Sequence, residues 1–311
     1  MSSLFDTFFH TATGNVPYDY QRRLAGASLV EGQVPSGLFP CQSQLISIPT
    51  GLGKTAAVVI AWLWNRIARN DESWPRRLIY CLPMRTLVEQ TRDEVGKWID
   101  NLRKNADALE LSPAMRERLD WLAAHSPIIL MGGEELDEGR REWDIHPERP
   151  AILIGTQDML LSRALNRGYG MARARWPMHF GLLNNDCLWV LDETQLMGVG
   201  VRTSAQLEGL RKKLGVVLGC ATWWSSATLD SRLLVTPDHR ALPATLALGP
   251  DDLKSQEVTQ RIEATSASLR SPFTLTSDSA KVVEPYIEQL AAAVLNHHQK
   301  DTTTIVYSQP C

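Results

Sequence analysis

A short glycine-rich segment is the first place in this sequence where residue types and spacing could do chemistry. Residues 50–55 lie between an apolar stretch, 44–48, and a segment with helical spacing. Backbone N–H groups at a helix start attract anions, and glycines let the backbone approach a phosphate closely. Lys54 can then reach the β and γ phosphates of a nucleotide, and the Thr55 hydroxyl can hold Mg²⁺. This phosphate-binding loop predicts a site for ATP and Mg²⁺ formed by Thr50, Gly51, Leu52, Gly53, Lys54 and Thr55.

The loop departs from the general phosphate-loop pattern at one position. The pattern G-x-x-x-x-G-K-[ST] requires a glycine where this chain has Ile48. The departure excludes the plain Walker A form and leaves the form T-G-x-G-K-T. A glycine-rich turn that binds nothing is the alternative, and the strand before the loop and the helix after it disfavour that alternative.

A second chemical feature is a pair of carboxylates after the apolar stretch 187–191. Open α/β sheets bind ligands at the carboxyl ends of their strands, where Asp192 and Glu193 would lie. We expect Asp192 to hold the metal through water and Glu193 to act as general base or to position the attacking water. The alternative is a solvent-facing acidic pair at a strand end, which the upstream loop disfavours.

Three further apolar stretches end in short polar groups. They are residues 77–82, which lead into Pro83–Gln90, residues 151–154, which lead into Gly155–Asp158, and residues 216–223, which lead into Ser225–Thr228. Amides and hydroxyls at such an edge can hold a sugar-phosphate backbone without reading bases. Each segment alone is equally consistent with a helix cap or a turn.

These motifs need an alternating pattern of elements to position them. Short apolar strands alternate with amphipathic helices, which predicts an α/β fold with a mainly parallel sheet and helices on both faces. We expect helices over 53–69, 84–104, 157–166 and 202–213, and a further strand over 127–131. The predicted organisation is an N-terminal segment (1–40), an ATPase domain (41–234), an irregular linker (235–280) and the start of a second domain (281–311).

The composition is that of a globular chain without an overall attraction for nucleic acid. Of the 311 residues 44% are hydrophobic, and the net charge is −3, so contact with a phosphate backbone needs a local basic surface. Residues 159–185 contain no Asp or Glu and four arginines, although an ordinary solvated face would read the same way. Five scattered cysteines, the lack of a basic segment before the apolar N-terminus and the lack of a long apolar run favour the cytoplasm.

In this order the motifs resemble those of superfamily 2 helicases, over about residues 15–230. The resemblance implies a RecA-like P-loop domain in which Gln21, of a Tyr-Gln-Arg segment, contacts adenine. A surface glutamine on a helix is the alternative for Gln21. The resemblance further implies contacts to DNA and residues that couple hydrolysis to movement. The implied DNA contacts are Pro83, Arg85, Gln90, Thr156 and Asp158, and the implied coupling residues are Gln195, Ser226 and Thr228.

Within that superfamily, residues 160–170 and 192–198 are similar to the helicase of type I CRISPR systems. The resemblance implies an ATP-driven motor on single-stranded DNA that is recruited by an RNA-guided surveillance complex. The resemblance also implies that residues 159–185 contact DNA. Arg163 and Arg167 would grip an unpaired strand, and aromatic side chains would stack on it.

The sequence differs from that family in two respects. The family's HD nuclease needs clustered histidines and aspartates, whereas the seven histidines here are dispersed and no His-Asp pair occurs. We therefore expect no nuclease activity from this polypeptide. The family also closes its ATP site with arginines from a second RecA-like domain, and these would lie beyond Cys311. An arginine finger contributes about 10³ to 10⁵ in rate, so we expect weak hydrolysis by this chain alone.

The sequence thus predicts an ATP-dependent DNA helicase domain, with the second RecA-like domain and the HD nuclease supplied elsewhere. Two alternatives remain open at this point. One is an RNA helicase of the DEAD-box kind, against which motif II continues with Thr194-Gln195 rather than Ala-Asp. The other is a module that binds DNA or a CRISPR complex without hydrolysis.

Overall fold

The structure is a computed structural model that describes residues 4–27, 41–132, 142–168, 171–228 and 230–263, together with 291, 292 and 295. Residues 1–263 form one compact unit and residues 264–311 another. The sheet, the helices and the candidate site belong to the first unit. The predicted second domain, 281–311, lies outside the described residues apart from the three isolated positions.

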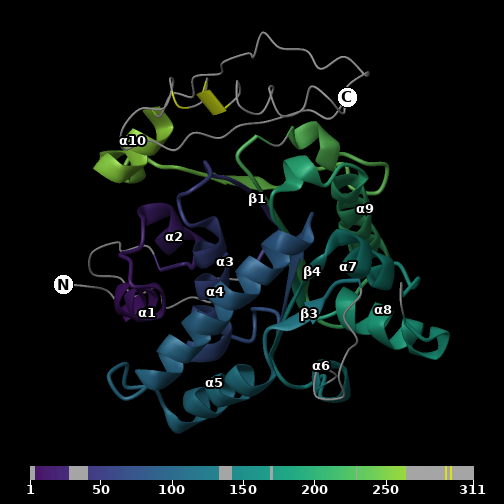
Figure 1. The fold of residues 1–311 in the computed structure, drawn as a ribbon. Helices are drawn as coiled ribbons and strands as arrows, with labels where there is room; N and C mark the ends of the chain where they lie inside the picture. Colours follow the sequence, from purple (N-terminus) through teal and green to yellow (C-terminus); the bar gives the residue numbers. More distant parts are fainter. Residues whose placement is uncertain are drawn as a thin grey trace. The chain divides into compact units, whose positions relative to one another are not determined.

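A seven-stranded parallel sheet runs through the middle of the unit (Figure 1). Its order is β3-β4-β2-β5-β6-β1-β7, and every neighbouring pair is parallel. Because all strands point the same way, their carboxyl ends meet at one edge of the sheet. The strands are β1 (Gln44–Ser47), β2 (Arg77–Leu82), β3 (Ile128–Leu130), β4 (Ala151–Thr156), β5 (Cys187–Leu191), β6 (Cys220–Ser226) and β7 (Ala244–Ala247).

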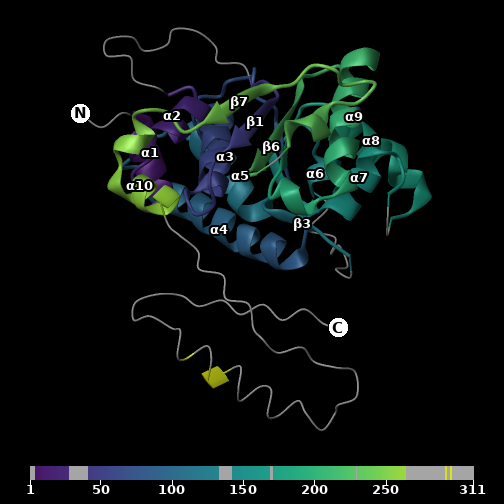
Figure 2. The ribbon, with the colours of Figure 1, turned by 90° about the horizontal axis from the view of Figure 1, so that it is seen from above.

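Helices from the N-terminal part of the chain cover one face of the sheet (Figures 1 and 2). Three phenylalanines of the first helix, Phe5, Phe8 and Phe9, are buried against this layer, as are Val95 and Ile99. The layer contains α1 (Leu4–Thr13), α2 (Asp19–Leu24), α3 (Lys54–Trp62), a π-helical turn (Leu63–Ala68), α4 (Arg85–Lys104) and α5 (Pro113–His125).

A second set of helices covers the opposite face and builds a separate hydrophobic core. Met159, Leu160 and Ala164 of one helix pack with Val201 and Ala205 of another in this core. The set contains α6 (Glu142–Ile145), α7 (Gln157–Ala164), a 3-10 turn (Arg173–Arg175), α8 (Trp176–Asn184), a second 3-10 turn (Thr194–Leu196) and α9 (Val199–Leu214).

The strand sequences explain why two cores form. Strand β5 is fully buried, and its side chains alternate between the faces of the sheet. Leu188 and Val190 belong to the core of the first face, whereas Trp189 and Leu191 belong to that of the second. A parallel strand covered on both sides has to be apolar at every position, which confirms the predicted fold class.

Most predicted strands and helices are found within a few residues of their expected bounds, but the strand predicted over 216–223 is displaced. Strand β6 begins at Cys220, and Val216, Val217 and Leu218 form an exposed turn before it. Trp223 and Trp224 are buried, whereas residues 216–218 are exposed. The strand therefore begins later than predicted and continues to Ser226.

The prediction of an irregular linker over 235–280 is wrong for residues 235–263, the part of this range that the structure describes. Residues 244–247 form β7, which pairs with β1, and residues 256–263 form α10 (Gln256–Glu263) after a 3-10 turn (Asp252–Lys254). Val258 of α10 is buried in the core of the first face. The compact unit therefore continues to Glu263 rather than ending at residue 234.

Candidate functional site

The phosphate-binding loop connects β1 to α3 at the carboxyl edge of the sheet. Gly51 and Gly53 have φ angles of 83° and 73°, in the left-handed region that glycine adopts without strain. Helix α3 begins at Lys54, so its first N–H groups face the loop. Ile48, which replaces the glycine of the general pattern, is fully buried in the core. The departure therefore serves packing, while its backbone carbonyl stays in the loop.

Lys54 lies inside this loop and is only 6% exposed. Its ammonium group donates to the Ile48 carbonyl at 3.2 Å and lies 3.9 Å from Glu193 Oε1. An ammonium group has three donors, so the one hydrogen bond leaves capacity for a ligand. The fold thus brings the loop and the acidic pair together, although 139 positions separate Lys54 from Glu193 (193 − 54).

Asp192 is held at the end of β5 by hydrogen bonds on both sides. Its backbone N–H donates to the Cys81 carbonyl at 3.1 Å, and its Oδ2 accepts from the Tyr80 hydroxyl at 2.6 Å. Burial and the Asp192 charge raise the pKa of Tyr80 well above its usual value, so the hydroxyl remains a donor. Glu193 has a φ of 52°, a strained angle for a residue with a side chain. The pair is oriented rather than free.

A path of hydrogen bonds joins the acidic pair after β5 to the polar residues at the end of β6. Gln195 Nε2 donates to Glu193, and Gln195 Oε1 accepts from the Ser226 hydroxyl at 2.7 Å. Ser226 Oγ in turn accepts from the Thr228 backbone N–H at 3.1 Å. Thr194 adds a parallel bond to the Ser225 carbonyl at 3.3 Å. All three residues that the resemblance marks for coupling therefore lie on one path from Glu193 to the end of β6.

Gln21 is buried against the phosphate-binding loop. Its Nε2 donates to the Gly53 carbonyl at 3.2 Å, and its Oε1 accepts from the Tyr18 backbone N–H at 2.9 Å. At 2% exposure it is not the surface glutamine of the alternative interpretation. Because Nε2 also donates to the Tyr20 hydroxyl at 3.3 Å, a bond from Nε2 to adenine would require the exchange of one of its two hydrogen bonds.

The predicted nucleic-acid contacts lie along the same carboxyl edge, after β2 and β4. Arg85, Gln90 and Asp158 are exposed, and Pro83 and Thr156 are partly exposed. Arg85 begins α4, and its guanidinium donates to the Gly132 carbonyl. These side chains can meet an extended strand that crosses the ends of β2 and β4.

Arg163 does not share that exposure, and here the expectation needs a correction. Its side chain is 2% exposed, and burial lowers the pKa of its guanidinium. It lies inside the helical layer with Nε and Nη1 unpartnered, so it cannot reach a strand at the surface in this conformation. Arg167 is exposed, and Arg173 lies over the Trp176 ring at 5.9 Å. The basic stretch thus divides into a buried arginine and a surface group.

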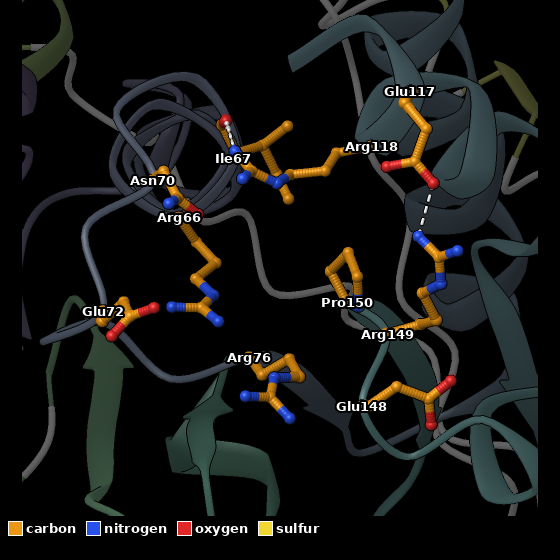
Figure 3. A pocket seen from close by; sticks show the side chains of 10 residues that line it. All are labelled: Arg66, Ile67, Asn70, Glu72, Arg76, Glu117, Arg118, Glu148, Arg149 and Pro150. Carbon is orange, nitrogen blue, oxygen red and sulfur yellow. Dashed lines mark hydrogen bonds and ion pairs between the residues drawn. The ribbon is translucent and has the colours of Figure 1, made fainter. Parts of the chain in front are cut away.

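A cavity of about 220 Å³ at the amino edge of the sheet was not predicted from the sequence (Figure 3). Arg149 is paired with Glu117 across one side of it, and Arg118 donates to the Ile67 carbonyl at 3.4 Å. Arg66 and Glu72 line another side. Its carboxylates nearly balance its arginines, and the cavity lies at the end of the strands opposite the phosphate-binding loop.

The described residues contain no group of three or more His, Cys, Asp or Glu side chains placed to hold a metal ion. No helix in the described part of the chain is long and apolar enough to cross a bilayer.

A parallel sheet with a phosphate-binding loop after β1 and an acidic pair after β5 defines a RecA-like nucleotide-binding domain. Residues 33–234 match the family model described as DEAD/DEAH box helicase, and the chain belongs to that family.

Solved structures with the same fold include the helicase MrfA bound to DNA, at 16% identity and a TM-score of 0.50, with 81% of this chain and 30% of that chain covered. Mss116p bound to single-stranded RNA and AMP-PNP matches at 19% identity and a TM-score of 0.47, with 79% of this chain and 43% of that chain covered. This chain therefore spans less than half of either helicase. The comparison with curated proteins found no match.

Proposed function

We propose that this chain is the nucleotide-binding RecA-like domain of an ATP-dependent motor on single-stranded DNA. The observation that carries the proposal is the hydrogen-bond path Glu193–Gln195–Ser226–Thr228, which begins at the acidic pair beside Lys54. A path of this kind supports transmission of the state of the nucleotide to the edge where a nucleic-acid strand would lie.

On this proposal Lys54 moves from the Ile48 carbonyl to the β and γ phosphates when ATP binds. The N–H groups at the start of α3 hold the same phosphates, and the favourable helix dipole adds to that contact. The positive φ angles of Gly51 and Gly53 support a loop that closes around an anion.

Mg²⁺ would be held by the Thr55 hydroxyl, the phosphates and, through water, Asp192. The donor set fits this ion, since Mg²⁺ prefers oxygen ligands and usually keeps several waters with one or two carboxylates. When bound, it would neutralise charge on the phosphates. Tyr80 donates to Asp192 Oδ2 and so orients this carboxylate.

Glu193 would accept a proton from the attacking water or orient that water. The side chain is partly exposed and lies 3.9 Å from Lys54, so it reaches the space in front of the phosphates. Its backbone N–H donates to Asp192 Oδ1 at 2.9 Å, which fixes the two carboxylates relative to one another.

The nucleic acid would cross the carboxyl ends of β2 and β4. Arg85, Gln90, Thr156 and Asp158 offer contacts to a sugar-phosphate backbone, with Pro83 beside them, and Arg167 extends the surface. None of these contacts reads a base, which suits a motor that moves along any sequence.

DNA is the favoured strand, and RNA is the second candidate. Motif II of this chain continues with Thr194-Gln195 instead of the Ala-Asp of DEAD-box RNA helicases. MrfA, bound to DNA in its structure, shares this fold at a TM-score of 0.50. Competition between DNA and RNA strands of the same sequence for the chain separates the two candidates.

A role in CRISPR interference is supported by residues 160–170 and 192–198, which are similar to the helicase of type I CRISPR systems. It predicts that an RNA-guided surveillance complex bound to its target DNA recruits this chain. Co-sedimentation of the chain with such a complex, with and without target DNA, tests it. Equal recovery in both samples would contradict that role.

Nucleotide binding is the first experiment. We expect Lys54→Ala to raise the Kd for ATP about 10- to 100-fold, because a hydrogen bond to a charged group contributes about 1.5 to 3 kcal/mol. Lys104→Ala, at the far end of α4, is the matched control. ATP binding that survives Lys54→Ala unchanged would sink the assignment of the loop.

Coupling is the second experiment, on the chain joined to a complete second RecA-like domain. Ser226→Ala should leave DNA-stimulated hydrolysis within a few-fold of the parent and reduce strand displacement per ATP. A binding module without turnover predicts instead ATP and DNA binding with no hydrolysis in the parent itself. The two outcomes distinguish a motor from that alternative.

A further inference from the structure

A guanidinium group from the far end of the compact unit lies against the phosphate-binding loop. An ideal Cβ placed on Gly51 would lie 2.2 Å from Arg261 Nη2 and 2.5 Å from Arg261 Nε. A Cβ at this position would require the Arg261 guanidinium to move away from the loop. Arg261 belongs to α10, in a segment that has no place among the helicase motifs.

Helix α10 is held beside the loop by contacts with α2. The side chain of Asp252 is fully buried; its Oδ1 accepts from the Tyr20 backbone N–H at 2.8 Å, and its Oδ2 accepts from Arg23 at 2.9 Å. The Tyr18 hydroxyl donates to Glu257 at 2.9 Å, and Val258 is buried in the core. Tertiary packing therefore places α10, which carries Arg261, beside the loop.

Arg261 forms no ion pair with a described residue, and Glu257, one turn earlier on α10, accepts from the Tyr18 hydroxyl instead. Among the described residues, no carboxylate lies within 4.0 Å of its guanidinium, and the side chain is exposed. The nearby start of α3 carries the positive end of a helix dipole, and Lys54 adds a full positive charge. An anion bound at the loop would interact favourably with both of these charges and with the helix start.

We propose that Arg261 is a further nucleotide-binding residue, which contacts the phosphate chain of ATP from the side of the loop at Gly51. The proposal rests on the proposed nucleotide site. A guanidinium presents a planar fork of N–H donors that matches two phosphate oxygens, which a lysine cannot do. The segment 244–263 would then belong to the ATP site, as a clamp on the loop that α2 and Asp252 hold in place.

The experiment measures the Kd for ATP with Mg²⁺ on the full 311-residue chain by titration calorimetry. Arg261→Gln should weaken ATP binding about 5- to 10-fold, since it removes a charged hydrogen-bond donor at a partly exposed site. Arg261→Lys should recover only part of the loss, because the paired donors are missing. Lys254→Gln is the matched control: it removes a positive charge from the same segment, where Lys254 pairs with Asp251 at the surface.

The outcomes separate this inference from the function on which it rests. No ATP binding by the parent chain, or binding that Lys54→Ala leaves intact, would overturn the nucleotide site itself. Normal binding by the parent, loss in Lys54→Ala and no change in Arg261→Gln would overturn the inference alone. Tighter binding in Arg261→Gln would also overturn it, because Arg261 would then be a cover that ATP has to displace. Thermal unfolding of each variant tests whether the substitution at the exposed Arg261 leaves the fold intact.

Discussion

Buried cations occur at both edges of the parallel sheet, and their partners differ. At the carboxyl edge, Lys54 has one hydrogen bond to a carbonyl and a carboxylate at 3.9 Å. At the amino edge, Arg77 is 4% exposed, and its three nitrogens donate to the carbonyls of Leu182, Pro147 and Asn185 at 3.2, 2.8 and 2.9 Å. Lys54 has donors to spare for a ligand, whereas Arg77 uses its side chain to join segments of the fold.

The difference follows from what each edge must do. A binding site keeps polar groups incompletely satisfied so that a ligand can complete them, and that costs stability. At the carboxyl edge the positive φ of Glu193 is consistent with such a cost. At the amino edge, each of the three guanidinium nitrogens of Arg77 donates to a carbonyl, which offsets the cost of burying the charge. Substitutions at the two edges should therefore change different quantities.

The largest effect should come from Glu193→Gln. We expect the rate of ATP hydrolysis to fall about 10³-fold, within the range that a general base contributes. ATP binding and the free energy of unfolding should change little, because glutamine keeps the shape of the side chain. Hydrolysis is measured on the chain joined to a complete second RecA-like domain, with single-stranded DNA present.

Asp120→Asn in the same protein is the control, since Asp120 is exposed on α5 and belongs neither to the proposed ATP site nor to the proposed DNA contacts. A loss of less than about tenfold in Glu193→Gln would contradict the general-base role.

Arg77→Ala should have the opposite profile. We expect it to lower the free energy of unfolding by about 3 kcal/mol, because buried carbonyls lose a charged donor. The folded fraction should still bind ATP with the parent's affinity. Urea denaturation gives the first quantity and titration calorimetry the second. Unchanged stability would refute the structural role of this arginine.

The pH dependence of stability tests another buried contact, the one between α6 and α8. Helices α6 and α8 are joined by the pair His179 Nε2–Asp144 Oδ2 at 2.8 Å, with Arg175 on the same carboxylate. Burial lowers the pKa of His179 below its usual 6.5. Burial would raise the pKa of Asp144, but hydrogen bonds from His179 and Arg175 lower it.

The sign follows from the proton count. Below pH 6.5 the unfolded chain binds a proton on His179 that the folded protein still excludes, so stability falls as the pH falls from about 6.5 toward the lower folded pKa. The slope is at most about 1.4 kcal/mol per pH unit. His179→Gln should remove this part of the slope, and the exposed His10→Gln should not. Equal slopes in both variants and the parent would refute the burial effect.

Arg76→Gln should have the smallest effect. Arg76 adjoins Arg77, but its guanidinium is partly exposed and pairs with Asp186 at 3.4 Å. Such a pair contributes about 0.5 kcal/mol to the free energy of unfolding. Urea denaturation beside Arg77→Ala measures the contrast. If Arg76→Gln lowered the free energy of unfolding as much as Arg77→Ala, the location of both residues at the amino edge, rather than burial, would determine the effect.

The sequence by itself determined the features that depend on local backbone chemistry. The phosphate-binding loop could be predicted because a strand, two glycines, a lysine and a helix start are consecutive in the chain. The acidic pair after β5 could be predicted because the carboxyl ends of parallel strands meet at one edge. Alternation of apolar strands with amphipathic helices was enough for the fold class.

Only the tertiary structure decided what long-range packing controls. No local pattern distinguishes the buried Arg163 from the exposed Arg167, because their burial depends on the helices that surround them. Residues 244–263 read as irregular, since short elements with exposed side chains gain their order from contacts with β1 and α2. The bond between Gln195 and Ser226 and the approach of Arg261 to Gly51 join positions that the sequence keeps apart.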